Sequence, residues 1–63
     1  MDVSRLKPGD KIETVDGAIA EVMKESEDGR WILVRYLSGT QDPALLGTED
    51  LCEEAEVAQL VAS

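Results

Sequence analysis

Cys52 is the single cysteine of the chain and the only candidate nucleophile among its side chains. A reactive thiol needs a nearby cation, a histidine or a helix N-terminus to lower its pKa. Cys52 stands instead in the acidic run EDLCEE at residues 49–54, and the chain contains no histidine. Because this setting disfavours the thiolate, we predict that Cys52 is a small, semi-buried hydrophobic residue and that no residue is catalytic.

The acidic residues suggest two further kinds of chemistry, and the sequence supports neither. Paired carboxylates can cleave glycosidic bonds, but they need a pocket that separates their pKa values, and a chain of 63 residues has little room for one. The segment ESEDG at residues 25–29 lacks the alternating oxygen ligands and the distal glutamate of a calcium loop. We therefore predict no enzyme activity, no cofactor and no metal ion.

The formal net charge of −8 comes from 14 acidic and 6 basic residues, which are unevenly distributed. All basic residues lie between Arg5 and Arg35, whereas the charged residues of 36–63 are all acidic. Binding to nucleic acids depends largely on cations that neutralise the phosphate backbone. The charge therefore disfavours a nucleic-acid partner and indicates either a solvated surface or an acidic surface for a basic partner.

The length and composition predict one small domain that spans residues 1–63. No stretch of about 20 apolar residues is present, so we expect no segment that crosses a membrane. Residues 1–7 lack the apolar core of a signal peptide, and a single cysteine suits a reducing compartment. The expected location is the cytoplasm.

Three strands are predicted in the first part of the chain. Residues 11–15, 18–25 and 30–37 show alternation or are rich in β-branched and aromatic residues. The Asp16-Gly17 pair is a strong signal for a two-residue hairpin turn, and a second Asp-Gly pair stands at residues 28–29. The pattern predicts a mainly β fold that contains a twisted antiparallel meander.

The C-terminal segment allows two interpretations. One is a single helix over residues 48–61, with Thr48 as its N-cap. The other, which we favour, is a strand over residues 48–52, a tight 3-10 turn over 53–57 and a last strand over 58–62. In this second case the last strand pairs with the first and covers its open edge.

The order of strands and Asp-Gly turns resembles that of small SH3-like barrels of the KOW and Tudor kind. The similarity rests on LKPGDKI at residues 6–12, DGAIAEV at 16–22, RWILVRY at 30–36 and the closing segment 49–57. It implies a small SH3-like barrel with a short C-terminal 3-10 or helical segment. A KOW module would bind nucleic acid. A Tudor module would need an aromatic cage, for which Trp31 and Tyr36 are too few.

The two-residue period of a strand assigns side chains to opposite faces. We predict that the core lies on the face that carries the small and β-branched residues, because small side chains suit the interior of a narrow barrel. Its predicted members are Ile12, Val15, Ala18, Ala20, Val22, Ile32, Val34, Leu51 and Val57.

The opposite face then carries Ile19, Met23, Trp31 and Leu33. A contiguous apolar patch on a monomer usually marks an interaction site, and Trp and Met are enriched at interfaces. Two alternatives stay open: the C-terminal segment or the loop residues Leu45 and Leu46 bury this face, or a partner protein does. If Leu45 and Leu46 do not pack down, they extend the Trp31 surface.

We therefore predict a non-catalytic protein-interaction module. Its partner is another protein, for example as an accessory subunit of a larger complex, or a second copy of the chain, and no small-molecule substrate is evident. The alternative is a KOW-like nucleic-acid-binding module that uses the basic residues of the N-terminal half. These are Lys7, Lys11, Lys24, Arg30 and Arg35.

Overall fold

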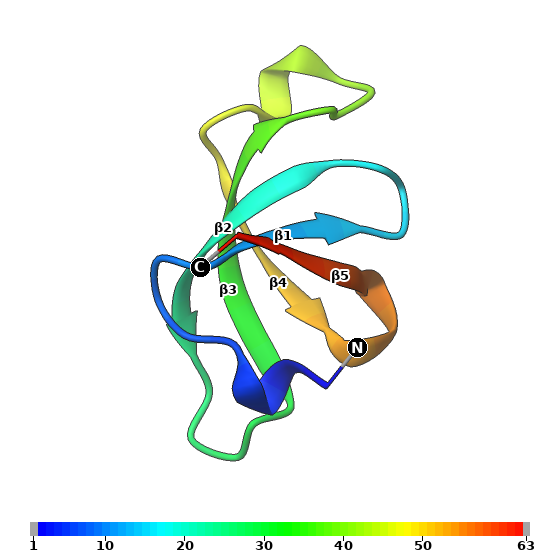
Figure 1. The fold of residues 1–63 in the computed structure, drawn as a ribbon. Coiled ribbons are helices and arrows are strands. Elements are labelled where there is room, and N and C mark those ends of the chain that lie inside the picture. Colours follow the sequence, from blue (N-terminus) through cyan, green and yellow to red (C-terminus); the bar gives the residue numbers. More distant parts are fainter. Residues whose placement is uncertain (1, 63) are drawn as a thin grey trace.

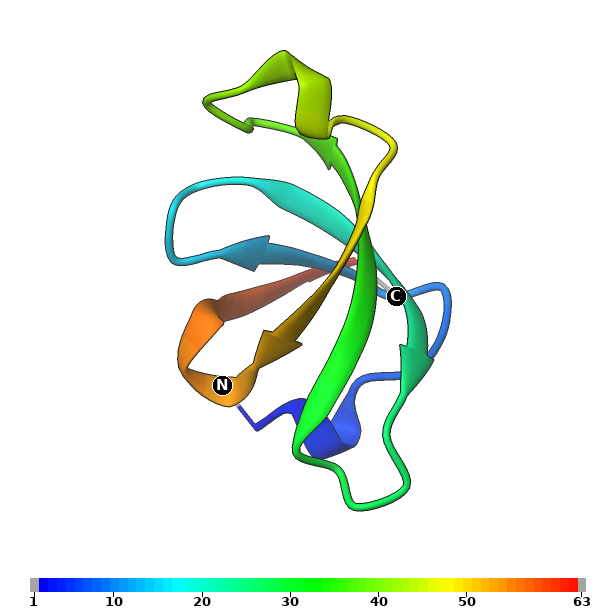
Figure 2. The same cartoon turned by 180° about the vertical axis from the view of Figure 1, so that it is seen from behind.

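Five antiparallel strands form one sheet in the computed structural model, which describes residues 2–62 (Figures 1 and 2). In chain order they are β1 (Lys11–Thr14), β2 (Ile19–Glu25), β3 (Trp31–Ser38), β4 (Glu49–Glu53) and β5 (Val57–Ala62). Over this range the helical elements are three 3-10 turns, none of them long and apolar enough to cross a membrane. These turns are η1 (Val3–Arg5), η2 (Pro43–Leu45) and η3 (Glu54–Glu56). The prediction of a mainly β fold is confirmed.

The strands lie in the order β4-β3-β2-β1-β5, so the first three form a meander of sequential hairpins. Both predicted Asp-Gly pairs lie in the connecting turns, but the first connection spans residues 15–18 and is longer than the predicted two-residue hairpin. Gly17 and Gly29 have φ angles of +89° and +72°. Glycine adopts this left-handed region without the steric cost that a Cβ brings. The amide of Gly17 donates to the carbonyl oxygen of Thr14 at 2.9 Å and closes the first turn.

The C-terminal segment forms the two strands and the 3-10 turn that we favoured, and the alternative of a helix over residues 48–61 is wrong. β5 pairs with β1, with Leu60 opposite Ile12 and Val57 opposite Thr14. This pairing satisfies backbone groups along an edge of β1 that a C-terminal helix would leave open. The sharp turn between β4 and β5 is held by a reciprocal capping box between Glu53 and Glu56.

The core lies on the inner face of the curled sheet. Its buried apolar residues are Val3, Leu6, Ile12, Ala20, Val22, Ile32, Val34, Cys52 and Val57, and Ala18 is buried as well. The predicted core positions of β2 and β3 are thus confirmed. Cys52 is 1% exposed, so it is a full member of the core rather than semi-buried.

Two residues that we predicted in the core lie on the surface. Val15 is 60% exposed and Leu51 is 52% exposed. Val15 lies in the turn that follows β1 rather than in the strand. In β4 the two-residue period explains the other correction, because Cys52 is buried on the inner face and its neighbour Leu51 therefore faces outward.

The N-terminal turn η1 adds two core residues that the sequence pattern did not reveal. Val3 and Leu6 are 2% and 1% exposed, and η1 packs against β3 at one end of the sheet (Figure 1). Asp2 caps the turn: its Oδ1 accepts hydrogen bonds from the amide of Ser4 at 2.9 Å and from the Ser4 hydroxyl at 2.6 Å.

Candidate functional site

An apolar strip crosses the outer face of β2, β3 and β4. Leu33 lies at its centre, opposite Leu51 of β4 and next to the register shift of β2 that contains Met23. Trp31 lies two residues from Leu33 and therefore on the same face of β3. We call Met23, Trp31, Leu33 and Leu51 the outer strip. Leu51 is half exposed and the other three side chains are partly exposed, so neither the η2 loop nor β5 buries this face.

Ile19 is separated from the outer strip by a row of charges. The register places Glu21 opposite Arg35, and Arg35 opposite Glu49. Nη2 of Arg35 lies 3.4 Å from Oε2 of Glu49. Because this row occupies the outer face between Ile19 and Leu33, the structure does not bring Ile19 together with the other predicted interface residues.

Leu45 and Leu46 are exposed, at 43% and 46%, and do not pack down onto the outer face. They lie in and just after η2, beyond the end of β3, whereas Trp31 begins that strand (Figure 1). The amide of Gly47, next to Leu46, donates to the carbonyl oxygen of Tyr36 at 2.9 Å, and the pair of Arg35 and Glu49 lies between this point and Leu33. The two leucines therefore do not extend the outer strip, contrary to the sequence-based expectation.

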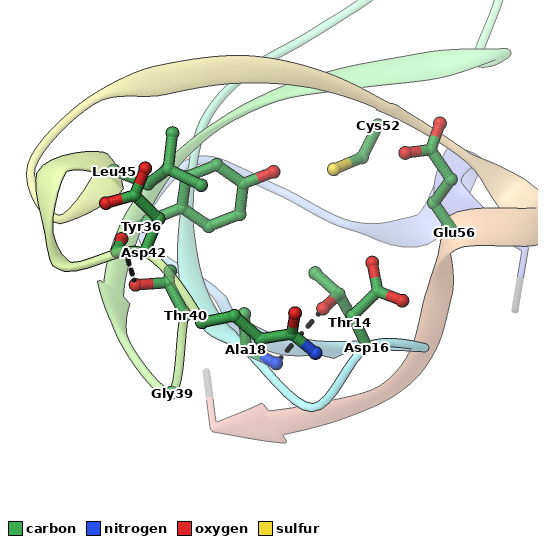
Figure 3. A pocket seen from close by; sticks show the side chains of 11 residues that line it. Thr14, Asp16, Ala18, Tyr36, Gly39, Thr40, Asp42, Leu45, Cys52 and Glu56 are labelled. Carbon is green, nitrogen blue, oxygen red and sulfur yellow. Dashed lines mark hydrogen bonds between the residues drawn. The ribbon is translucent and has the colours of Figure 1, made fainter.

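A pocket of about 360 Å³, which no sequence pattern predicted, opens at the η2 end of the sheet (Figure 3). Tyr36, Leu45 and Cys52 contribute to its apolar wall, and Asp16, Asp42 and Glu56 contribute carboxylates. These residues come from the β1–β2 turn, from β3, from the η2 loop, from β4 and from η3. Segments distant in sequence thus build the site, which explains why no local motif reveals it.

The hydroxyl of Tyr36 and the thiol of Cys52 are the weakly acidic groups of this pocket, and carboxylates lie close to both. The Tyr36 hydroxyl donates to Oδ2 of Asp50 at 3.2 Å. Burial first, and then the neighbouring acidic groups of Cys52 and Asp50, raise the pKa of Tyr36 to about 12. Burial, together with the charges of Glu56 and Asp50, raises the pKa of the Cys52 thiol to about 11. Both groups are therefore protonated near pH 7, and the pocket offers no thiolate nucleophile.

The acidic residues do not converge on a single point. In the described range 2–62, no group of three acidic or cysteine side chains could hold a metal ion. Two of the basic residues named for nucleic-acid binding also lie beside carboxylates. Arg35 is paired with Glu49, and Nε of Arg30 lies 3.9 Å from Oδ2 of Asp28.

Comparison with known proteins identified no relative of this chain. No protein-family model, no curated protein and no solved structure matches this chain. The resemblance to SH3-like barrels therefore stays a prediction.

Proposed function

We propose that this chain is a non-catalytic, SH3-like protein-interaction module of the cytoplasm that docks a partner protein on the outer strip. The observation that supports this most directly is that the half-exposed Leu51 adjoins three partly exposed apolar side chains, Met23, Trp31 and Leu33, on one face of three adjacent strands. Such patches on a monomer usually mark interaction sites, and tryptophan is among the strongest anchors of interfaces. The unpaired thiol of Cys52 suits a reducing compartment.

The charges around the outer strip favour a partner with a basic rim. On the outer face of β4, Glu49 and Glu53 stand on either side of Leu51, and Glu53 lies opposite Trp31. Glu49 pairs with Arg35 and Glu53 takes part in the capping box of η3, but both carboxylates keep acceptor capacity for a partner with an apolar centre and a basic rim. A second copy of the chain would instead bring together two chains with a net charge of −8 each, so a different protein fits better than self-association.

A matched pair of variants tests the proposal. Leu51→Lys places a charge in the outer strip, and Leu46→Lys makes the same change at a leucine of similar exposure at the other end of β3. We expect that the immobilised wild-type chain and Leu46→Lys retain the same proteins from a host lysate, and that Leu51→Lys loses them while its circular dichroism spectrum is unchanged. Equal retention by all three chains would contradict the proposal.

Sedimentation equilibrium over a wide concentration range tests the choice of partner. A monomer at all concentrations is the expected result. A dimer that Leu51→Lys converts to a monomer would show that the outer strip binds a second copy of the chain. That result would overturn the proposed basic-rimmed partner but would support the outer strip as the binding site. A Leu51→Lys chain that fails to fold would show instead that this face is structural.

A further inference from the structure

The pocket at the η2 end of the sheet has the chemistry of a cation site with an apolar wall. We propose that it binds the guanidinium group of an arginine side chain presented by a basic segment of a partner protein. The site is separate from the outer strip, because Tyr36 and Cys52 line it from the inner face of the sheet, whereas the strip lies on the outer face. Ligand binding in the pocket does not require binding at the outer strip.

Charge is the first argument for this ligand. Asp16, Asp42 and Glu56 reach the pocket from three separate segments, and none of its lining residues is a lysine or an arginine. Burial is the main cause of the raised pKa of the Cys52 thiol within the pocket, and the charges of Glu56 and Asp50 add to it. A concave site lined by one sign of charge concentrates ligands of the opposite sign.

The apolar wall is the second argument. Figure 3 shows the ring of Tyr36 with the side chain of Leu45 on the same side of the pocket. A planar cation is attracted to an aromatic ring, and arginine makes such contacts more often than lysine. The pocket volume of about 360 Å³ falls within the range for ligand sites, about 300 to 1,000 Å³, and it leaves room for a whole arginine side chain.

The placement of the carboxylates around the pocket favours one kind of cation. The three carboxylates do not form a metal-binding group. In Figure 3 Asp42 lies on the side of Tyr36 and Leu45, whereas Asp16 and Glu56 lie across the pocket. An ammonium group is a compact point charge, but a guanidinium group carries five N–H donors in a planar fork and can reach more than one carboxylate. Arginine therefore fits the arrangement better than lysine.

Two of the carboxylates are held in place before any ligand binds. Oδ1 of Asp42 accepts a hydrogen bond from the amide of Ala44 at 3.0 Å, and the Thr40 hydroxyl donates to the Asp42 carbonyl oxygen at 2.8 Å. Oε1 of Glu56 accepts from the amide of Glu53 at 3.3 Å. A carboxylate has acceptor capacity for several hydrogen bonds, so both groups retain capacity for a ligand and lose little freedom on binding.

The test is a titration of the folded chain with the peptide acetyl-Gly-Arg-Gly-amide, followed by the backbone amide signals in NMR spectra at about 20 mM salt, where screening is weak. We expect saturable shifts at Tyr36, Thr40 and Asp42. The lysine peptide should bind several-fold more weakly. The citrulline peptide, which has the same shape without the charge, should cause no saturable shifts.

Isosteric variants locate the site without disturbing the fold. Asp42→Asn keeps an N-cap residue for η2, and Glu56→Gln keeps the capping box of η3. Each should weaken the arginine peptide about threefold to tenfold, the range expected for one charged hydrogen bond at a partly open site. Glu27→Gln makes the same charge change in the turn between β2 and β3, at the opposite end of the sheet, and should alter the affinity less than about twofold.

Three results would overturn the inference. They are the absence of saturable shifts with the arginine peptide, equal binding of the arginine and citrulline peptides, and equal weakening by Glu27→Gln and by the two pocket variants. Equal binding of the lysine peptide would overturn the choice of guanidinium. None of these readouts involves the outer strip, so failure here is distinguishable from failure of the proposed function.

Discussion

Replacing Gly39 with alanine should destabilise the protein more than the same change at Gly47, although both glycines have the same backbone conformation. Their φ angles are +75° and +80°. A Cβ on Gly39 would lie 2.7 Å from the carbonyl oxygen of Gly17 and 3.2 Å from the Cα of Ala18, whereas a Cβ on Gly47 would meet nothing within 4 Å. The two variants therefore share the backbone strain and differ in the steric contact.

The magnitudes follow from these two terms. The left-handed region costs an L-residue about 1 to 2 kcal/mol, and the reduced freedom of the unfolded chain offsets about 0.4 to 1 kcal/mol of this cost. We expect Gly47→Ala to lower the free energy of unfolding by about 1 kcal/mol. At Gly39 the contact is with backbone atoms, which cannot rotate away, and overpacking of this kind adds about 1 to 3 kcal/mol. The expected total for Gly39→Ala is about 2 to 4 kcal/mol.

Urea unfolding followed by Trp31 fluorescence and far-ultraviolet circular dichroism measures both free energies. Since Gly39 holds the η2 loop against the β1–β2 turn, Gly39→Ala should also shift the backbone amide signals of Asp16 and Thr40, and Gly47→Ala should shift Asp16 much less. If the two variants lose the same stability within about 0.5 kcal/mol, the close approach of the two loops does not contribute as the structure indicates.

Two further predictions concern buried groups of the sheet. Thr14 is 6% exposed, and its Oγ1 accepts a hydrogen bond from the amide of Ala18 at 3.1 Å. Thr14→Val should therefore lower the free energy of unfolding by about 1 to 3 kcal/mol and speed hydrogen exchange at the Ala18 amide. Thr14→Ser keeps the acceptor and the slow exchange, and equal exchange rates in the two variants would contradict this role of Thr14. The folded protein binds the Cys52 proton more tightly than the unfolded chain, because folding raises the pKa of the thiol from 9.0 to about 11. The free energy of unfolding should therefore fall as the pH rises from about 9 to about 11, with the Cys52 part of the loss reaching about 1.4 kcal/mol at pH 10. Urea unfolding at pH 8 and pH 10 measures this loss, which should be smaller in Cys52→Ala, and an equal loss in both proteins would refute the assignment.

The strands of the meander could be predicted because the signals that specify them are local. Asp16-Gly17 and the Asp-Gly pair at residues 28–29 fix the two turns, and alternation fixes which side of each strand faces the core. The error at Leu51 was avoidable by the same rule. Leu51 shares its face with Glu49 and Glu53, and a face that carries two carboxylates belongs in solvent.

The outer strip was only partly predictable. Alternation placed Trp31 and Leu33 on the outer face, but which neighbours they meet depends on strand register. The register brings Leu51 beside Leu33 and puts the pair of Arg35 and Glu49 between Leu33 and Ile19. No property of the isolated strands carries that information, since a shift of one residue in pairing exchanges the faces of a whole strand.

The sequence by itself determined the mainly β character of this protein, its turns and the inner face of its central hairpins, because these follow from backbone preferences and a two-residue period. Tertiary structure alone decided the rest. The C-terminal segment became a strand because the edge of β1 offered it hydrogen-bond partners, and Val3 and Leu6 entered the core because η1 packs against β3. The pocket exists only where the folded chain brings Asp16, Tyr36 and Glu56 together, since contacts between distant segments are set by the packing of the whole sheet.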